Sequence, residues 1–343
     1  MVLLVLASLH FSKAGHTAAS LPLYNNPMRV PNVPLPPLVV ITGPTASGKS
    51  AVALRLTEEL AGEIVSADSR QVYKLMDIGT AKPTPEEQAR VSHHLIDLVY
   101  PYEPYTLALF QQDAYTTINE VGSRGKLPIL AGGTPLYVNA VVEGWTVPRT
   151  EPDLELRRRL EAEAGEHGPQ RLHARLAQLD PAAAENILPS NTRRIIRALE
   201  VIERTGQPIS AQQDKVPPPY RTLTIVLDCG RPELYRRIDS RVDEQIRRGL
   251  VEEVAHLHEL GYAFDLPSMS GIGYRQVGAY LQGTTTLPDA IQRMKWDTHN
   301  FARHQGNWFR RAASALHIDA THDDPYPAVL REVRRFLNME GDS

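Results

Sequence analysis

Cysteine is nearly absent from the sequence, since Cys229 is the only one among 343 residues. A single cysteine excludes an intramolecular disulfide and any zinc module built from several cysteines. Such usage is typical of a reducing compartment, so we expect a cytoplasmic protein. Long apolar runs are also lacking: none reaches the roughly 18 residues that a membrane-spanning helix needs, and we therefore expect no membrane association.

Neither sign of charge is in large excess, because the formal net charge is −3 at pH 7. This balance provides no overall attraction to nucleic acid, so any such binding must come from local groups of Lys and Arg. The histidine pairs lack the four-residue helical spacing and flanking Glu of a hydrolytic zinc site. With 42% hydrophobic residues, the chain is otherwise typical of a globular protein with one large domain or two moderate ones.

The first 37 residues combine a short apolar stretch, Val2–Ala7, with a proline-rich segment that ends at Pro37. The only early positive charge, Lys13, follows the apolar stretch instead of preceding it, which argues against a secretory signal peptide. We expect residues 1–37 to be a flexible leader, or translation to begin at Met28.

A complete phosphate-binding loop is the most informative feature that is present. It lies between an apolar run, Leu38–Thr42, and a helical pattern, Ala51–Leu60. Its glycines allow several backbone N–H groups to face one point, and the helix N-terminus adds partial positive charge. Lys49 is expected to neutralise phosphate oxygens, and Ser50 to ligate Mg²⁺. The predicted diphosphate- or nucleotide-binding residues are Gly43, Pro44, Thr45, Ala46, Ser47, Gly48, Lys49 and Ser50.

Strand-like and helix-like segments alternate after this loop, which predicts a parallel α/β sheet. Residues 149–220 show helical patterns only, and a strand pattern then returns. We therefore expect a P-loop-type parallel sheet core flanked by helices, formed by residues 38–148 and 221–343, with an all-helical insertion at 149–220. The predicted strands are Leu38–Thr42, Glu63–Ala67, Leu127–Ala131 and Thr222–Leu227; the predicted helices include Asp153–Ala164, Gln170–Leu179, Thr192–Arg204 with an Asn191 cap, and Pro288–Arg311.

The second acidic motif of ATP-hydrolysing enzymes is missing. The strand Leu127–Ala131 ends in Gly-Gly-Thr and not in Asp. Asp68, which follows the strand Glu63–Ala67, is the only early carboxylate in a comparable place. It is either a general base facing a substrate beside the phosphates or a helix cap.

Arginines gather in three places, at 157–159, at 193–197 and at 236–248. Each group is either a solvated helix face or a set of contacts to phosphate and unpaired bases. One arginine of the last group is expected to reach the bound phosphate. The aromatic residues of the long C-terminal helix are expected in the core and not on a stacking surface; they are Trp296, Phe301, Trp308 and Phe309.

Further short motifs follow the phosphate loop in a fixed order. They are Asp68–Tyr73, Asp77–Pro83, Gly132–Thr134, Arg197–Val201 and Gly273–Gln276. Together with the loop they resemble the bacterial tRNA dimethylallyltransferases, also called tRNA isopentenyltransferases, over about residues 38–311.

The resemblance implies transfer of a dimethylallyl group from its diphosphate to N6 of the adenosine 3′-adjacent to the anticodon in tRNA. Diphosphate would be released, Mg²⁺ would assist, and ATP would not be consumed. Asp68 would accept the N6 proton, Lys49 and Arg241 would stabilise the departing diphosphate, and Thr45 and Thr134 would bracket the reacting centre. We expect a monomer.

The resemblance also implies that the helical insertion holds the anticodon stem-loop. The implied tRNA-binding residues are Asp68, Ser69, Arg70, Gln71, Thr134, Arg193, Arg194, Ile195, Ile196 and Arg197.

The chain departs from the family pattern at Lys74-Leu75, where the family usually has Arg-Gly. Because Leu adopts left-handed backbone conformations less readily than Gly, the family pattern does not predict the conformation of this loop. The segment around His299-Asn300 departs as well. Three other functions are alternatives. A small-molecule phosphotransferase would be revealed by ATP turnover, and a prenyltransferase of free adenine nucleotides would not need the helical insertion. The third alternative is a non-enzymatic RNA-binding module.

Overall fold

The computed structural model describes residues 35–148, 150–212, 214–311 and 314–338. Most of the predicted leader, residues 1–34, lies outside this range, and Pro37 already belongs to the first strand. Leu35–Ser343 form one compact unit.

A six-stranded parallel sheet forms the centre of this unit, with the strand order β3-β2-β4-β1-β5-β6. All four predicted strands are confirmed, while the two edge strands were not predicted. One edge strand has only two residues, and the other is largely exposed, so neither shows a buried pattern. The strands are β1 Pro37–Thr42, β2 Gly62–Ser66, β3 His93–His94, β4 Leu127–Gly132, β5 Arg221–Asp228 and β6 Leu316–Asp319.

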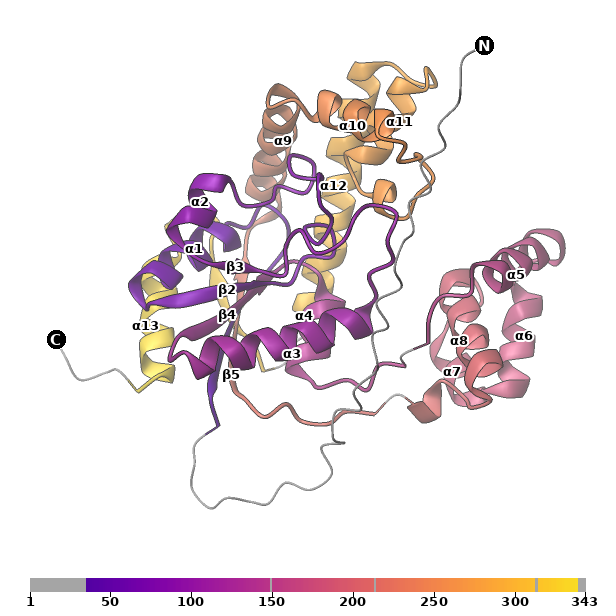
Figure 1. The fold of residues 1–343 in the computed structure, drawn as a ribbon, viewed down its shortest axis with the longest axis horizontal. Coiled ribbons are helices and arrows are strands. Elements are labelled where there is room, and N and C mark those ends of the chain that lie inside the picture. Colours follow the sequence, from indigo (N-terminus) through magenta and orange to yellow (C-terminus); the bar gives the residue numbers. More distant parts are fainter. Residues whose placement is uncertain (1–34, 149, 213, 312–313, 339–343) are drawn as a thin grey trace, which may run out of the picture. The chain divides into compact units, whose positions relative to one another are not determined.

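Helices cover both faces of the sheet, as expected for parallel strands (Figure 1). Leu38 and Val40 of β1 pack in one hydrophobic cluster with α3 (Leu107–Ser123) and α4 (Pro135–Val142). Val39 and Ile41 alternate to the other face, where they pack with α1 (Lys49–Glu59) and α13 (Tyr326–Phe336). The predicted α/β class is confirmed.

Further helices pack beyond the carboxyl ends of the strands. Buried side chains from these helices share one hydrophobic cluster with Val72, Tyr73 and Met76 from the loop after β2. The predicted long helix is confirmed as α12, but of its aromatic residues Phe309 is buried whereas Trp296 and Phe301 are exposed. These elements are α9 Arg231–Arg247, α10 Leu250–Glu259, a short 3₁₀ helix Ser268–Ser270, α11 Tyr274–Leu281 and α12 Leu287–Phe309. A further short helix, α2 Pro85–Arg90, has no buried residue and lies outside this cluster.

Four helices and a short 3₁₀ helix (Ser210–Gln212) occupy the sequence between α4 and β5. They enclose a hydrophobic cluster of their own, and Asn191 caps the fourth helix by accepting a hydrogen bond from Arg194 N. Because β1 pairs with both β4 and β5, the sheet continues across this helical segment. The four helices are α5 Leu154–His167, α6 Pro169–Leu179, α7 Pro181–Asn186 and α8 Thr192–Thr205.

Candidate active site

A pocket of about 570 Å³ opens at the carboxyl ends of β1, β2 and β4. Parallel α/β sheets characteristically bind ligands at this edge. Its wall is formed by the phosphate loop, the loop after β2, the turn Gly132–Thr134, and side chains of α9 and α12. The pocket therefore brings together segments that are widely separated in the sequence.

The phosphate loop has the backbone that its sequence predicts. Gly43 and Gly48 adopt φ angles of 146° and 91°, and a Cβ atom on Gly43 would lie 2.6 Å from Leu227 O. α1 begins at Lys49, so its N-terminus meets the loop. Thr45, Lys49 and Ser50 line the pocket, where an anion would meet them.

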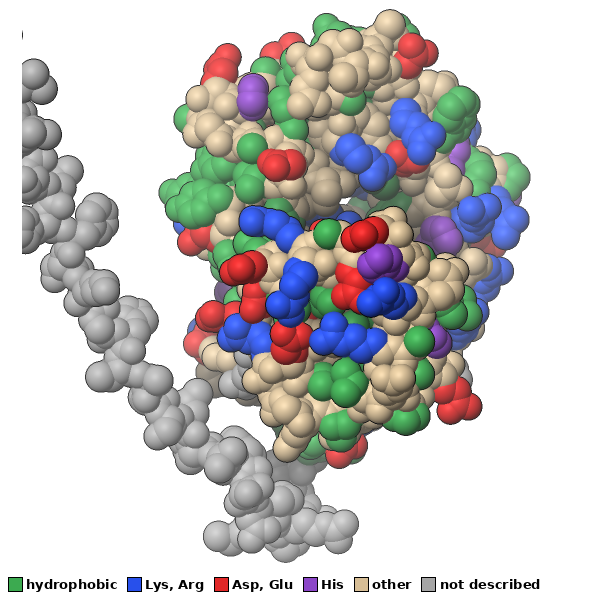
Figure 2. Space-filling view, turned by 90° about the vertical axis from the view of Figure 1, so that its right-hand side faces the viewer, with side chains coloured by type: hydrophobic (Ala, Val, Ile, Leu, Met, Phe, Trp, Pro, Cys, Tyr) green, Lys and Arg blue, Asp and Glu red, His purple; other side chains and the backbone are tan. Residues whose placement is uncertain are grey.

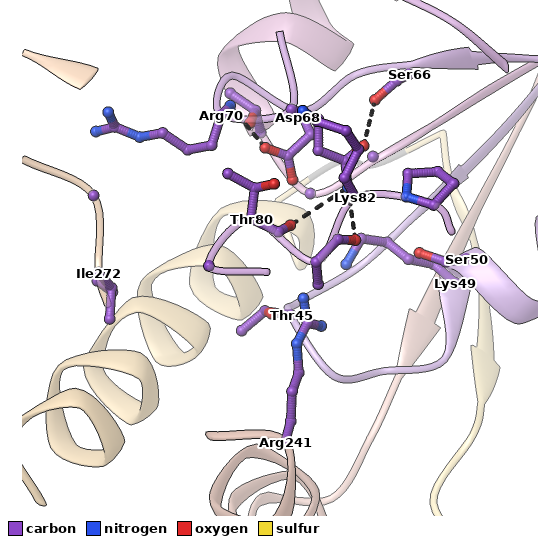
Figure 3. Close-up of a pocket in the computed structure, with 18 of the residues that line it drawn as sticks. Thr45, Lys49, Ser50, Ser66, Asp68, Arg70, Thr80, Lys82, Arg241 and Ile272 are labelled. Carbon is purple, nitrogen blue, oxygen red and sulfur yellow. Dashed lines mark hydrogen bonds between the residues drawn. The ribbon is translucent and has the colours of Figure 1, made fainter. Parts of the chain in front are cut away.

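Two positive side chains and one carboxylate face one another in this pocket. Figure 3 shows Arg241 extending from α9 toward Thr45, with Asp68 on the opposite side. Burial and the nearby Arg241 guanidinium lower the pKa of Lys49 to about 8, while the charge of Asp68 acts in the other direction. Burial likewise lowers the pKa of Arg241, partly offset by Asp68. An added anion would relieve the repulsion between the two cations.

Asp68 is held by a turn and does not cap a helix. Its Oδ1 atom accepts a hydrogen bond of 2.9 Å from Arg70 N, and no helix starts there in the described structure. The helix-cap interpretation is therefore wrong. Because Asp68 lines the pocket at the end of β2, its carboxylate is placed to meet a substrate.

Thr134 joins the turn after β4 to the loop after β2. Its Oγ1 atom accepts a hydrogen bond of 3.1 Å from Ser69 N, and Thr134 N donates to Ala67 O at 3.3 Å. Gly132 permits this close approach, because a Cβ atom there would lie 2.2 Å from Ala67 O. The predicted residues Asp68, Ser69 and Thr134 are thus neighbours.

The side chains of Arg70 and Gln71 form hydrogen bonds mainly with other parts of the protein. Gln71 Nε2 donates to Ala81 O at 3.1 Å, and Gln71 Oε1 accepts from Ser66 Oγ at 3.0 Å. The Arg70 guanidinium donates to Pro267 O at 2.9 Å and points away from Asp68 (Figure 3). Both residues line the pocket and also fix the loop in which Asp68 lies.

Gln305 of α12 is a site residue for which the sequence suggested no role. Its Oε1 atom accepts from Thr45 N at 2.9 Å, and its Nε2 atom donates to Gly133 O at 2.5 Å. The side chain is 3% exposed. Gln305 therefore links the phosphate loop to the turn after β4.

The predicted tRNA-binding residues of α8 lie outside the pocket lining. Arg193 and Arg194 are exposed, while Arg197 donates to Glu200 at 2.6 Å and to Pro148 O at 3.3 Å. The prediction for the side chains of Ile195 and Ile196 is wrong, because both are buried in the core of this helical segment. They can support an RNA surface only by holding α8 in place.

The face in Figure 2 shows Lys and Arg side chains interspersed with Asp and Glu, without one continuous basic patch. This agrees with the small net charge. Within the described residues, no helix is long and apolar enough to cross a membrane.

Comparison with known proteins identifies the family. Residues 71–312 match the family model described as IPP transferase, and residues 36–97 match the model described as isopentenyl transferase. A protein of Roseiflexus sp. (strain RS-1) named tRNA dimethylallyltransferase is 53% identical over 302 residues, which cover 88% of this chain and 99% of the relative. A protein of Dehalococcoides mccartyi with the same name is 46% identical over 90% of this chain and 94% of the relative.

Two solved structures have a similar fold. The tRNA isopentenylpyrophosphate transferase of Bacillus halodurans is 41% identical and has a TM-score of 0.65, covering 88% of this chain and 95% of its own. A eukaryotic dimethylallyltransferase acting on tRNA is 26% identical with a TM-score of 0.75, covering 88% of this chain and 80% of its own. The chain therefore belongs to the tRNA dimethylallyltransferase family.

Proposed function

We propose that this protein transfers the dimethylallyl group of dimethylallyl diphosphate to N6 of the adenosine 3′-adjacent to the anticodon in tRNA. The observation that supports this most is the arrangement of Lys49, Arg241 and Asp68 around one pocket beside the phosphate loop. The two cations suit the diphosphate of the donor, and the carboxylate suits the amine of the acceptor. Family membership argues against the phosphotransferase and RNA-binding-module alternatives.

Asp68 is proposed to accept the proton that the acceptor amine loses. An adenine amine is a poor nucleophile because its lone pair is delocalised into the ring. As the N6–C1 bond forms and the C1–O bond breaks, the amine loses a proton and diphosphate leaves with the bonding electrons. A carboxylate that accepts this proton in the transition state lowers the barrier. Asp68 is the pocket carboxylate fixed at the end of β2.

Lys49 and Arg241 are proposed to stabilise the negative charge of the departing diphosphate. Preorganised cations act most strongly where water is excluded, and burial already lowers the pKa of both side chains. Thr45 and Thr134, from the two loops that Gln305 joins, are proposed to bracket the reacting carbon.

Mg²⁺ is proposed to bind at Ser50, which is exposed and lines the pocket. Mg²⁺ is usually held by one or two protein oxygens together with substrate phosphates and water, and one hydroxyl beside a diphosphate fits that pattern. Among the described residues, no group of three or more His, Cys, Asp or Glu could hold a metal ion. The bound ion would neutralise charge on the diphosphate.

The anticodon stem-loop is proposed to contact Arg193, Arg194 and the exposed part of Arg197, while the flipped adenosine meets Asp68–Gln71. Exposure of the first two arginines supports this assignment. The protein is further proposed to act as a monomer in the cytoplasm, where its tRNA substrate is found; light scattering tests the oligomeric state.

The test incubates the protein and Mg²⁺ with labelled dimethylallyl diphosphate and unmodified tRNA that has adenosine after the anticodon. Label should enter that nucleoside at N6. Asp68→Asn keeps the size of the side chain but removes the base, so the rate of transfer should fall about 100-fold or more. Transfer at the wild-type rate by Asp68→Asn would remove Asp68 from its role. Transfer to free AMP as fast as to tRNA would instead favour a prenyltransferase of free nucleotides.

A further inference from the structure

Three tyrosine rings form a column near the surface, on two segments outside the pocket lining. The rings of Tyr100 and Tyr102 have centroids 6.1 Å apart and planes within 2°. The rings of Tyr102 and Tyr262 have centroids 6.2 Å apart and planes within 13°. Tyr100 is 40% exposed and Tyr102 is 63% exposed. We call Tyr100, Tyr102 and Tyr262 the tyrosine column.

A positive charge lies at one end of the column. Lys74 Nζ is 4.6 Å from the centroid of the Tyr100 ring, within the range of a cation–π interaction. An aromatic surface with an adjacent cation is the combination that proteins use to bind single-stranded nucleic acid, where bases stack on the rings and phosphates meet the cation.

The column is connected to the segment that follows Asp68. Leu98 N donates to Val72 O at 2.8 Å, and Lys74 N donates to Val99 O at 2.8 Å. The chain that leads into Tyr100 is therefore hydrogen-bonded to residues 72–74, which directly follow the motif Asp68–Gln71.

A second connection passes through the loop before α11. Ser268 Oγ donates to Pro101 O at 2.7 Å, between two members of the column. Arg70, which lines the pocket, donates to Ser268 O at 3.1 Å. Two hydrogen bonds, through Ser268, thus connect the column to Arg70, a residue of the pocket where adenosine is proposed to enter.

Tyrosine rings are well suited to this task. A tyrosine has only two side-chain torsions to order when a base stacks on it, and stacking does not depend on base identity. The formal net charge of −3 provides no overall attraction to RNA, so contacts such as base stacking have to contribute to affinity.

We propose that the tyrosine column stacks an unpaired base of the tRNA anticodon loop, next to the adenosine that enters the pocket. This inference rests on the proposed function, because that function supplies the RNA. Tyr102 is 63% exposed although it lies between the other two rings, so part of its ring surface is open to a base. A base stacked there would stabilise the bound loop and help to hold the neighbouring adenosine in its flipped-out position.

The experiment measures binding of an unmodified anticodon stem-loop RNA to wild type, Tyr102→Ala and Tyr102→Phe, without dimethylallyl diphosphate. Removal of the ring should raise Kd about 5- to 150-fold, the usual effect of losing one stacked base. Tyr102→Phe retains the ring and should restore most of the affinity. Because Tyr102 is mostly exposed, thermal melting of Tyr102→Ala should match wild type.

A second measurement uses RNA with an abasic nucleotide at each loop position beside the adenosine. One abasic position should weaken binding to wild type but not to Tyr102→Ala, since the ring and base form a single contact. Wild-type affinity of Tyr102→Ala for every RNA would overturn the proposal and leave the column for another partner. Binding is measured without turnover, so failure of the column is distinguishable from failure of transfer.

Discussion

Binding of dimethylallyl diphosphate should take up a proton through Lys49. Burial and the charge of Arg241 lower the pKa of this amine to about 8 in the free protein. Bound diphosphate would place negative charge beside the ammonium group and raise the pKa again. The donor therefore binds the protonated form more tightly, and affinity becomes linked to pH.

The sign of the effect follows from the two protonation states. Below pH 8 Lys49 is already charged in the free protein, so the dissociation constant should not change with pH. Above pH 8 the free protein loses this proton, and each pH unit should weaken binding up to tenfold until the pKa of the complex is reached. The total change between pH 8 and pH 10 is at most about 100-fold.

Calorimetric titration with dimethylallyl diphosphate, in buffers of different ionisation enthalpy, measures both affinity and proton uptake. Uptake should be near zero at pH 7 and approach one proton at about pH 9. A terminal phosphate loses its last proton near pH 6, below this window. Lys49→Arg stays charged throughout and should remove the dependence. Equal affinity at pH 7 and pH 9 without proton uptake by wild type would refute the reasoning.

Three substitutions test the bonds and backbone conformations around the pocket and in the loop after β2. Gln305→Glu replaces the donor to Gly133 O by an oxygen, so kcat/KM should fall about 5- to 150-fold and recover partly at low pH, as the acid regains a proton; wild-type kinetics would contradict the link. Leu75 has φ 66°, a conformation that suits Gly better than Ala. In urea titration the free energy of unfolding of Leu75→Gly should therefore be about 1 kcal/mol higher than that of Leu75→Ala, whereas Ala is usually the more stabilising residue. Gly132→Ala should lower the melting temperature, because its Cβ would collide with Ala67 O. An unchanged melting temperature would show that the ends of β2 and β4 can move apart to make room for the Cβ atom.

The sequence located the parts of the site that depend on local pattern. The strand Leu38–Thr42 is a short apolar run followed by glycine, and the phosphate loop needs its glycines for its own backbone, so both can be read without tertiary information. The same holds for Asp68, which directly follows the strand at Glu63–Ala67. The edge strand His93–His94 is too short to show an alternating apolar pattern. Only its pairing with β2 defines it as a strand.

Other features depend on distant partners. Gln305 lies 260 residues from Thr45 and 172 from Gly133, so nothing near it in the sequence indicates its role. The error at Ile195 and Ile196 has a different cause. The prediction treats neighbouring residues of α8 as one RNA-binding block, although helical periodicity turns the apolar members toward the core.

The motif Asp77–Pro83 shows why a family motif does not have to be a set of substrate contacts. This segment is irregular, so its backbone groups need partners from elsewhere. Glu253 accepts hydrogen bonds from the N–H groups of residues 77, 78 and 79, and Gln245 donates to the carbonyls of Ile78 and Gly79. Lys82 is buried and pairs with Asp77 and Asp97, each at 2.5 Å.

These bonds hold a pocket wall in one conformation while leaving its surface free for a ligand. Since a buried charge without a partner is costly, Lys82 needs carboxylate partners. Its bond to Asp77 joins the two ends of the segment, and its bond to Asp97 ties the segment to the loop after β3. Thr80 then stands in the pocket wall without belonging to any helix or strand. The buried ion pairs account for the identity of Asp77 and Lys82 without a catalytic role for Lys82. Glu253 and Gln245 bond only backbone groups of the motif.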